Sequence, residues 1–325
     1  MRRRELIALV AIATAWPLIV HAQPQRPVIR LLSSASPERF AHLILAFREG
    51  LQELGYKEGE NVLIEYRWAN DQIDQLAVLA EELARRQVTI IVASGGTAPA
   101  LAAKAVTSKI PIVFTAAADP VELGLVASLG RPGGNVTGST AFTSSLDPKR
   151  LELLRELMPG VRVFGVLTNP AKPNAENDWR DLQKTAQALG QEVVNIEASS
   201  ELDFDTAFER AVAKPVGALL VAADPLFNGH RRRLVRLAAQ HSIPTIYQDR
   251  AFATAGGLIS YGASITAAYR QAGIYAGRIL QGAAPADLPV LQPTQFEFVI
   301  NLKTARTLGL TIPLTLQAQA DEVIE

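Results

Sequence analysis

Short apolar runs alternate with longer amphipathic stretches along most of the chain. Residues 88–93 and 110–114 form runs rich in β-branched side chains, which are typical of strands buried on both faces. Phe40, Phe47 and Leu54 belong to a stretch in which apolar positions recur three and four residues apart, a spacing that predicts an amphipathic helix. Because such strands and helices alternate from residue 28 onward, the sequence predicts an α/β fold with parallel sheets.

The first 22 residues follow a different pattern. Three arginines at 2–4 precede an apolar run from Leu6 to Val20, and Val20 and Ala22 place small side chains before Gln23. This layout is typical of a secretory signal peptide cleaved after Ala22. The run is shorter than the roughly 20 apolar residues that span a bilayer, so a membrane anchor or a buried first helix is the less favoured alternative. We therefore expect a periplasmic protein.

The order of predicted elements in the second half of the chain repeats that of the first. Residues 32–34 and 167–169 end equivalent strands, and residues 110–114 and 243–247 form another equivalent pair. The two offsets, 135 and 133 positions, are nearly equal, as expected for structural repeats. We therefore predict two Rossmann-like lobes joined by a hinge of three crossovers. The predicted limits are residues 23–140 plus 264–292 for lobe 1 and 141–263 plus 293–325 for lobe 2.

The composition narrows the possible functions. Lysine and arginine together number 32, as do aspartate and glutamate, so nothing favours nucleic acid or an anionic membrane as a partner. The chain has no cysteine, which excludes disulfides, thiolate metal sites and cysteine nucleophiles. It lacks the glycine-rich nucleotide-binding motifs and the serine elbow of hydrolases, and its histidines have no partner at a useful spacing. We therefore expect no enzyme activity, no cofactor and no metal.

Ligands of open α/β folds bind beyond the carboxyl ends of the strands. Here the six loops predicted at those ends are rich in small hydroxyl residues, glycine and amides. Such a lining suits hydrogen bonds to a small polar molecule held between the lobes. The residues predicted to contact the ligand are Ser33, Ser34, Ser94, Gly95, Gly96, Thr97, Ala116, Ala118, Asp119, Asn169, Asn174, Asp224, Phe227 and Gln248.

Several of these positions also have a purely structural interpretation. Residues 94–97, Ser-Gly-Gly-Thr, open a predicted helix and can either cap it or receive an anion at its N–H groups. Asp119 and Asp224 each precede a proline, the pattern of a helix start; for Asp224, contact with a ligand ammonium is the alternative. Phe227 could stack on a ligand, although aromatic residues at strand ends more often belong to the core. Residues 230–233, His-Arg-Arg-Arg, are expected on a solvated helix face.

Motifs throughout the chain carry a resemblance to a known family. They include Phe-Arg-Glu-Gly-Leu-Gln-Glu-Leu-Gly-Tyr at 47–56, Arg-Pro-Gly-Gly-Asn-Val-Thr-Gly at 131–138, Asn-Leu-Lys-Thr-Ala at 301–305 and Ala-Asp-Glu-Val-Ile-Glu at 320–325. The chain resembles the TrpX-like group of bacterial ABC transporter substrate-binding proteins, which have the type I periplasmic binding protein fold. The resemblance implies a two-lobe receptor that closes on a small molecule and delivers it to a membrane permease.

The resemblance also implies roles for particular residues. In related amino-acid binders, hydroxyls and N–H groups of the loops after the third and fourth strands hold the α-carboxylate, which here corresponds to residues 94–97 and 116–118. Asp224 would meet the α-ammonium. Members similar to TrpX take aromatic amino acids, although the residues here would also suit a purine, a small amide or an aromatic acid.

The prediction is therefore a monomeric, periplasmic solute-binding protein of an ABC importer, with a permease as its protein partner. A ligand sensor for a membrane receptor kinase, and an exported hydrolase or isomerase, are the alternatives.

Overall fold

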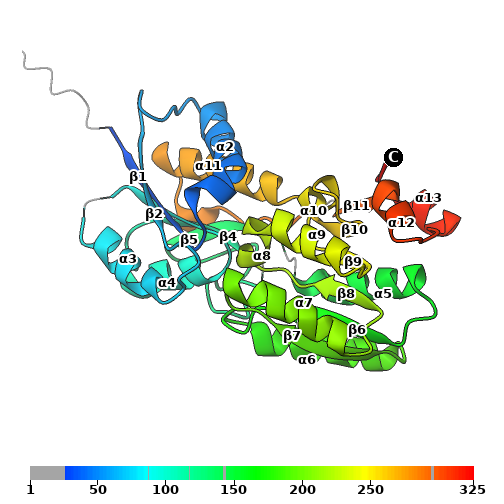
Figure 1. Ribbon diagram of the computed structural model, residues 1–325. Coiled ribbons are helices and arrows are strands. Elements are labelled where there is room, and N and C mark those ends of the chain that lie inside the picture. The colour runs from blue at the N-terminus through cyan, green and yellow to red at the C-terminus, as the bar shows by residue number, and fades with distance from the viewer. Residues whose placement is uncertain (1–25, 87, 117, 142–143, 294–295) are drawn as a thin grey trace, which may run out of the picture.

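Two β-sheets, each covered by helices on both faces, form the frame of the molecule (Figure 1). We refer to each sheet with its helices as a lobe. The predicted α/β fold with two lobes is confirmed. The predicted signal peptide, residues 1–22, lies outside the described residues. The structure, a computed structural model, describes residues 26–86, 88–116, 118–141, 144–293 and 296–325.

The sheet of lobe 1 is parallel, with the strand order β2-β1-β3-β4-β5. Helices α2 and α11 pack on one of its faces, and α3 and α4 on the other. Both faces of the central strands are therefore buried, which explains their uninterrupted apolar runs. The strands are β1 (Val28–Ser33), β2 (Leu63–Trp68), β3 (Ile90–Ser94), β4 (Ile112–Ala116) and β5 (Val136–Thr140). The helices are α2 (Pro37–Glu53), α3 (Gln75–Ala84), α4 (Ala98–Val106), α11 (Ile265–Leu280) and the 3-10 turn η3 (Pro285–Asp287).

The sheet of lobe 2 has the order β12-β11-β10-β9-β8-β6-β7. Its neighbours pair in parallel except for β10 and β11, which are antiparallel. The sequence predicted parallel sheets; β11 runs in reverse because the chain returns to lobe 2 at the end of the sheet where β10 leaves it. The strands are β6 (Val163–Thr168), β7 (Glu192–Glu197), β8 (Ala218–Val221), β9 (Thr245–Tyr247), β10 (Ile259–Ala263), β11 (Phe296–Asn301) and β12 (Glu322–Ile324).

Two groups of helices cover the sheet of lobe 2. Helices α5, α6, α12 and α13 pack on one face, and α7 to α10 pack on the other. The helices are α5 (Asp147–Leu157), α6 (Ala175–Ala188), α7 (Phe204–Ala213), α8 (Pro225–Gly229), α9 (Arg231–Gln240), α10 (Arg250–Thr254), α12 (Leu302–Thr307) and α13 (Leu314–Gln319), with the 3-10 turns η1 (Ser144–Leu146) and η2 (Glu201–Asp203).

The chain passes between the lobes after β5, after β10 and before β11. Arg150 connects the first two passages. Its buried guanidinium pairs with Asp147 at the start of α5 and donates from Nε to the carbonyl oxygen of Tyr261 in β10 at 2.7 Å. Three passages agree with a hinge of three crossovers, while the limits of the lobes at residues 140, 263 and 292 stay a prediction.

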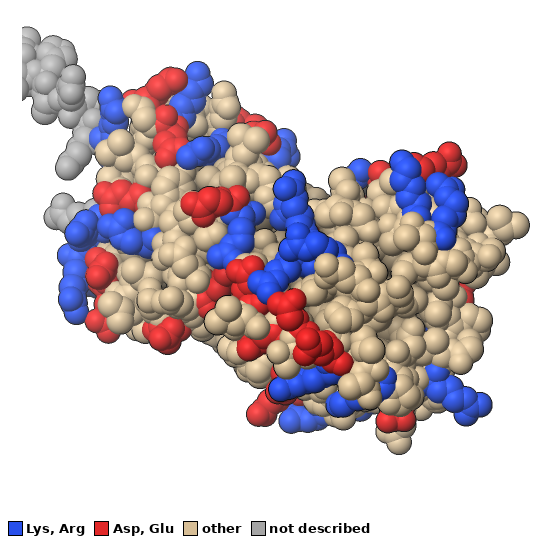
Figure 2. All heavy atoms as spheres, viewed as in Figure 1, with Lys and Arg blue, Asp and Glu red and all other residues tan. Residues whose placement is uncertain are grey.

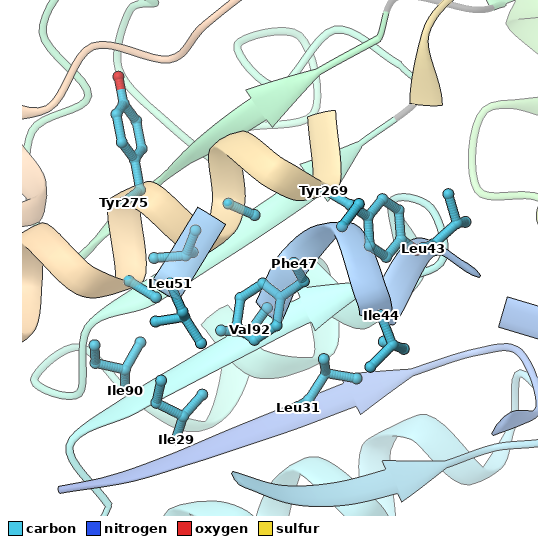
Figure 3. Close-up of a cluster of buried hydrophobic side chains, with 14 of the residues drawn as sticks. Ile29, Leu31, Leu43, Ile44, Phe47, Leu51, Ile90, Val92, Tyr269 and Tyr275 are labelled. Carbon is cyan, nitrogen blue, oxygen red and sulfur yellow. The ribbon is translucent and has the colours of Figure 1, made fainter. Parts of the chain in front are cut away.

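Helices α2 and α11 pack so closely that their backbones touch. Figure 3 shows α11 lying against α2 above β1 and β3, with Phe47 and Tyr269 in the shared core. A Cβ atom added to Gly50 would lie 1.9 Å from the carbonyl oxygen of Arg270, and one added to Gly273 would lie 2.1 Å from that of Phe47. Only glycine permits this approach. Because α11 starts two residues after β10, the contact also holds the second crossover in place.

Replacement of Gly273 by alanine should therefore destabilise the fold. The added methyl group meets backbone rather than a movable side chain, so we expect a loss of about 1–3 kcal/mol of unfolding free energy, measured by urea denaturation. Gly130→Ala is the control, because Gly130 is exposed and has open space around its Cα. Equal midpoints for the two variants would contradict the close packing of α2 on α11.

Candidate functional site

The carboxyl ends of both sheets face each other across a cleft that contains two small cavities. The first, which we call the polar chamber, has a volume of about 40 Å³. Both lobes contribute to it, and it carries three charged side chains. Its lining is Ser34, Asp71, Ile73, Gly95, Gly96, Thr97 and Ala98 from lobe 1 and Asn169, Ala171, Lys172, Pro173, Ser199, Asp224, Pro225 and Leu226 from lobe 2.

The second cavity, the apolar chamber, has a volume of about 50 Å³ and shares four lining residues with the polar chamber. Its walls are mostly hydrocarbon and aromatic. The rings of Phe40 and Tyr269 meet edge to face there, with centroids 6.4 Å apart. The lining is Phe40, Gly95, Gly96, Thr115, Ala116, Ala141, Asp224, Pro225, Asn228, Ile265, Ala268 and Tyr269.

Gly95 and Gly96 form the boundary between the two chambers. Their φ angles of +80° and +100° belong to the region that favours glycine. A Cβ atom on Gly95 would lie 2.7 Å from the hydroxyl oxygen of Ser34, and one on Gly96 would lie 2.7 Å from Cγ of Pro225 in lobe 2. The glycine pair therefore brings the start of α4 into contact with the opposite lobe.

Hydroxyl groups surround this glycine pair. Ser34 donates to the carbonyl oxygen of Gly95 at 2.5 Å, and the Gly95 N–H donates to the hydroxyl of Tyr269 at 2.9 Å. Burial raises the pKa of Tyr269 to about 12, while the nearby Ser94 and Thr115 hydroxyls oppose the rise. The buried hydroxyl of Thr97 has no hydrogen-bond partner among the described residues. A buried polar atom without a partner is a position where a ligand can bind favourably.

Asp224 is the buried acidic group that reaches both chambers. It caps α8 by accepting from the Leu226 N–H at 2.8 Å, and it accepts from Nδ2 of Asn169 at 3.2 Å. Burial raises its pKa above the ordinary value, and the charge of Lys172 opposes the rise. Lys172 itself donates to the carbonyl oxygen of Ala223 at 3.1 Å. A cationic group in the cleft would stabilise the charged form of Asp224.

Ionisable side chains from both lobes also meet at the edge of the cleft, and we call Arg39, Asp71, Glu201, His230 and Arg233 the interlobe ion cluster. In lobe 1, Arg39 pairs with Asp71 at 2.9 Å. In lobe 2, Glu201 pairs with Arg233 at 2.8 Å. His230 joins the two pairs, because its Nε2 lies 3.4 Å from Asp71 and contacts Arg39, while its Nδ1 lies 3.3 Å from Glu201. Figure 2 shows acidic and basic side chains gathered in a band over this junction.

The structure brings half of the predicted site residues to the walls of the two chambers. These are Ser34, Gly95, Gly96, Thr97, Ala116, Asn169 and Asp224. The others lie beside the chambers or farther away, and they are Ser33, Ser94, Ala118, Asp119, Asn174, Phe227 and Gln248.

Three expectations need correction. Asp119 accepts from the N–H groups of Val121 and Glu122, as a cap does, but a turn follows instead of a helix. Phe227 is wholly buried in the core of lobe 2, where its ring lies 6.0 Å from that of Phe204. His230 is buried in the interlobe ion cluster rather than exposed on a solvated helix face.

Sequence reasoning missed the residues that do not follow a recognised strand. Asp71 lies in the loop after β2, and the left-handed φ angles of Asn70 and Asp71 mark a tight turn there. Because ligands of open α/β folds bind beyond the carboxyl ends of strands, this loop would have been selected if residues 63–68 had been identified as a strand. Tyr269 lies within α11, so only the return of this helix to lobe 1 brings it to the cleft.

Two facing α/β lobes with a shared cleft at their strand ends have the fold of the type I periplasmic binding proteins. Solved proteins of that kind share the fold at 14% and 15% identity. The chain belongs to the ABC transporter substrate binding protein family, whose model matches residues 39–324. The resemblance to the TrpX-like group is thereby confirmed.

Similar proteins place the chain among substrate-binding proteins. It is 31% identical over 264 residues to a tyrosine-binding protein of Clostridioides difficile, covering 81% of this chain and 75% of that one. A conserved domain protein of Vibrio cholerae has a TM-score of 0.82 at 26% identity, covering 92% and 100% of the two chains. An ABC domain of Streptococcus pneumonia, solved in complex with L-Trp, has a TM-score of 0.79 at 26% identity, covering 91% and 100%.

Two general features of the described residues complete the picture. None of their helices combines the length and the apolar character that a membrane span requires. The same residues contain no group of three or more acidic or histidine side chains placed to hold a metal ion.

Loss of the interlobe ion cluster should favour an open arrangement of the lobes. In the double variant Arg39→Gln/His230→Gln, each lost pair removes up to about 1 kcal/mol, so the ligand-free protein should show a larger radius of gyration by small-angle X-ray scattering. Arg85→Gln, which breaks the exposed Arg85–Glu81 pair within lobe 1, should leave the radius unchanged. An unchanged radius in the double variant would mean that the cluster does not hold the lobes together.

Proposed function

We propose that this protein binds an amino acid with an apolar, preferably aromatic, side chain and delivers it to the permease of an ABC importer. The observation that carries the proposal is the division of one cleft into a polar chamber with Asp224 and an apolar chamber with Phe40 and Tyr269. A zwitterionic head and an apolar side chain need these two environments side by side. The tyrosine and tryptophan in the names of similar proteins support the same class of ligand.

The head group would bind around the glycine pair. The hydroxyl of Thr97 and the N–H groups at the start of α4 suit an α-carboxylate, because a helix N-terminus favours negative charge. Asp224 faces the same space from lobe 2 and would receive the α-ammonium. Since the two charges of the head bind to different lobes, the ligand would stabilise the closed arrangement over the open one.

The side chain would enter the apolar chamber. Phe40 and Tyr269 come from α2 and α11, the two helices that pack backbone to backbone, so their rings form a fixed wall. An aromatic side chain gains both area burial and ring contacts from such a wall. Asn228 also lines the apolar chamber and offers a polar group there.

Delivery to a permease, a periplasmic location and a monomeric state belong to the same proposal. Family membership supports delivery to a permease, and the predicted signal peptide supports the periplasmic location. We expect the cognate permease, solubilised in detergent, to retain a tagged form of the protein and to release it when an excess of untagged protein is added. Retention by a membrane receptor kinase in place of a permease would favour the sensor function instead.

A thermal-shift screen of amino acids tests the ligand class. L-Tryptophan, L-tyrosine and L-phenylalanine should raise the Tm progressively with concentration, because a ligand at 100 times its Kd increases the free energy of unfolding by about 2.7 kcal/mol. Glycine and L-glutamate are the controls for the head group alone and for a charged side chain. The absence of a shift with every amino acid would rule out this ligand class.

Asp224→Asn should weaken binding and stabilise the ligand-free protein. Loss of the charged partner of the ammonium should raise the Kd at least tenfold, measured by calorimetry.

Because burial raises the folded-state pKa of Asp224, its stabilising contribution is present at low pH and is lost as the pH rises through that pKa. The variant should therefore gain stability at neutral pH, measured as a higher urea midpoint.

Asp119→Asn is the matched control, since Asp119 also precedes a proline and caps N–H groups but lies outside both chambers. Its ligand affinity should equal that of the native protein. Equal Kd values for Asp224→Asn and the native protein would contradict the role of Asp224.

A further inference from the structure

A third cavity, the outer chamber, opens beside the apolar chamber. Its volume is about 350 Å³, several times that of either inner chamber. Phe40, Asn228 and Ile265 line both the outer and the apolar chamber, so the outer chamber continues the space in which the side chain of an amino acid would lie. Its walls come from α2, α9, α10 and the first turn of α11, which lie together in Figure 1.

The outer chamber contains two arginines without an acidic partner at ion-pair distance in the described part of the chain. Arg231 donates to the carbonyl oxygen of Asn228 at 3.2 Å, and burial lowers its pKa. Arg232 lines the same space. In contrast, Arg250, the third arginine of the lining, pairs with Glu322 at 2.6 Å. A partly buried guanidinium with unused donors, such as that of Arg231, is a strong binder of carboxylate groups, and Arg232 adds an exposed guanidinium beside it.

The lining of the outer chamber also contains two carboxyl groups and one histidine. Asp249 caps α10 by accepting from the Ala251 N–H at 2.7 Å; burial raises its pKa, and the charges of Arg231 and Arg150 oppose the rise. Burial and the charge of Arg231 lower the pKa of His42, so its imidazole is neutral at pH 7. Glu297 of β11 is the remaining carboxylate of the lining. The first N–H groups of the long helix α11 add further positive potential.

We propose that the outer chamber is an anion subsite of the ligand cleft, in which Arg231 and Arg232 recognise an acidic group at the far end of the bound side chain. This inference rests on the proposed function, because the head and body of the ligand must occupy the inner chambers. The ligand class then includes amino acids whose apolar or aromatic side chain ends in a carboxylate or a similar anion. Arg231 and Arg232 are specificity-determining residues for this end of the ligand.

Calorimetry with three phenylalanine derivatives tests the subsite. The ligands are L-phenylalanine, 4-carboxy-L-phenylalanine and 4-carbamoyl-L-phenylalanine, the last being a neutral group of nearly the same shape as the carboxylate. The native protein should bind the carboxylate at least tenfold more tightly than the carbamoyl compound, as expected for a charge-assisted hydrogen bond. The ratio should fall as salt is added.

The double variant Arg231→Gln/Arg232→Gln should reduce this ratio to within about twofold and leave the Kd of L-phenylalanine nearly unchanged. Arg236→Gln, an exposed arginine on the same helix outside the chamber, should preserve the native ratio. If L-phenylalanine binds but the carboxylate brings no gain, or if the gain survives in the double variant, the subsite is refuted and the proposed function stands. If no amino acid binds, the proposed function fails and the subsite fails with it.

Discussion

The backbone contact between α2 and α11 is the constraint on which the cleft depends. Gly50 and Gly273 allow the two helices to touch, and α11 begins where the chain leaves the sheet of lobe 2. The same helices carry Phe40 and Tyr269 into the apolar chamber, while the first turn of α2 carries Arg39 into the interlobe ion cluster. Helices α2 and α11 therefore form one packed unit that contains part of the hinge, one wall of the cleft and some of the contacts that close it.

Most of the fold could be predicted from the sequence because its central strands are buried on both faces. Such strands appear as uninterrupted β-branched runs, and the structure places β3 and β4 within two residues of the predicted runs. The edge strand β2 was harder to recognise, since Leu63–Trp68 is only partly buried and mixes charged with apolar residues. The reversed direction of β11 depends on where the chain re-enters lobe 2, which no local pattern encodes.

The site was predictable where it follows local rules and unpredictable where tertiary structure creates it. Gly95, Thr97 and Asp224 lie at strand ends, so one rule selected them, and the structure brings all three to the chambers. The same rule selected Phe227, which turns into the core because α8 presents its apolar side inward. His230 gains Asp71 and Arg39 as partners only when the lobes meet, so spacing along the chain could not indicate this part of its environment.

The two lobes meet at Gly96 and Pro225, one residue without a side chain and one with a rigid ring. Neither residue has a side chain that can move aside, so this contact limits how closely the two lobes can approach each other. The width of the gap that remains between the lobes then limits the thickness of a ligand, and this limit does not depend on the groups that recognise the ligand. A substitution at one of these two positions could widen or narrow the gap, while the groups that recognise the ligand on either side stayed the same.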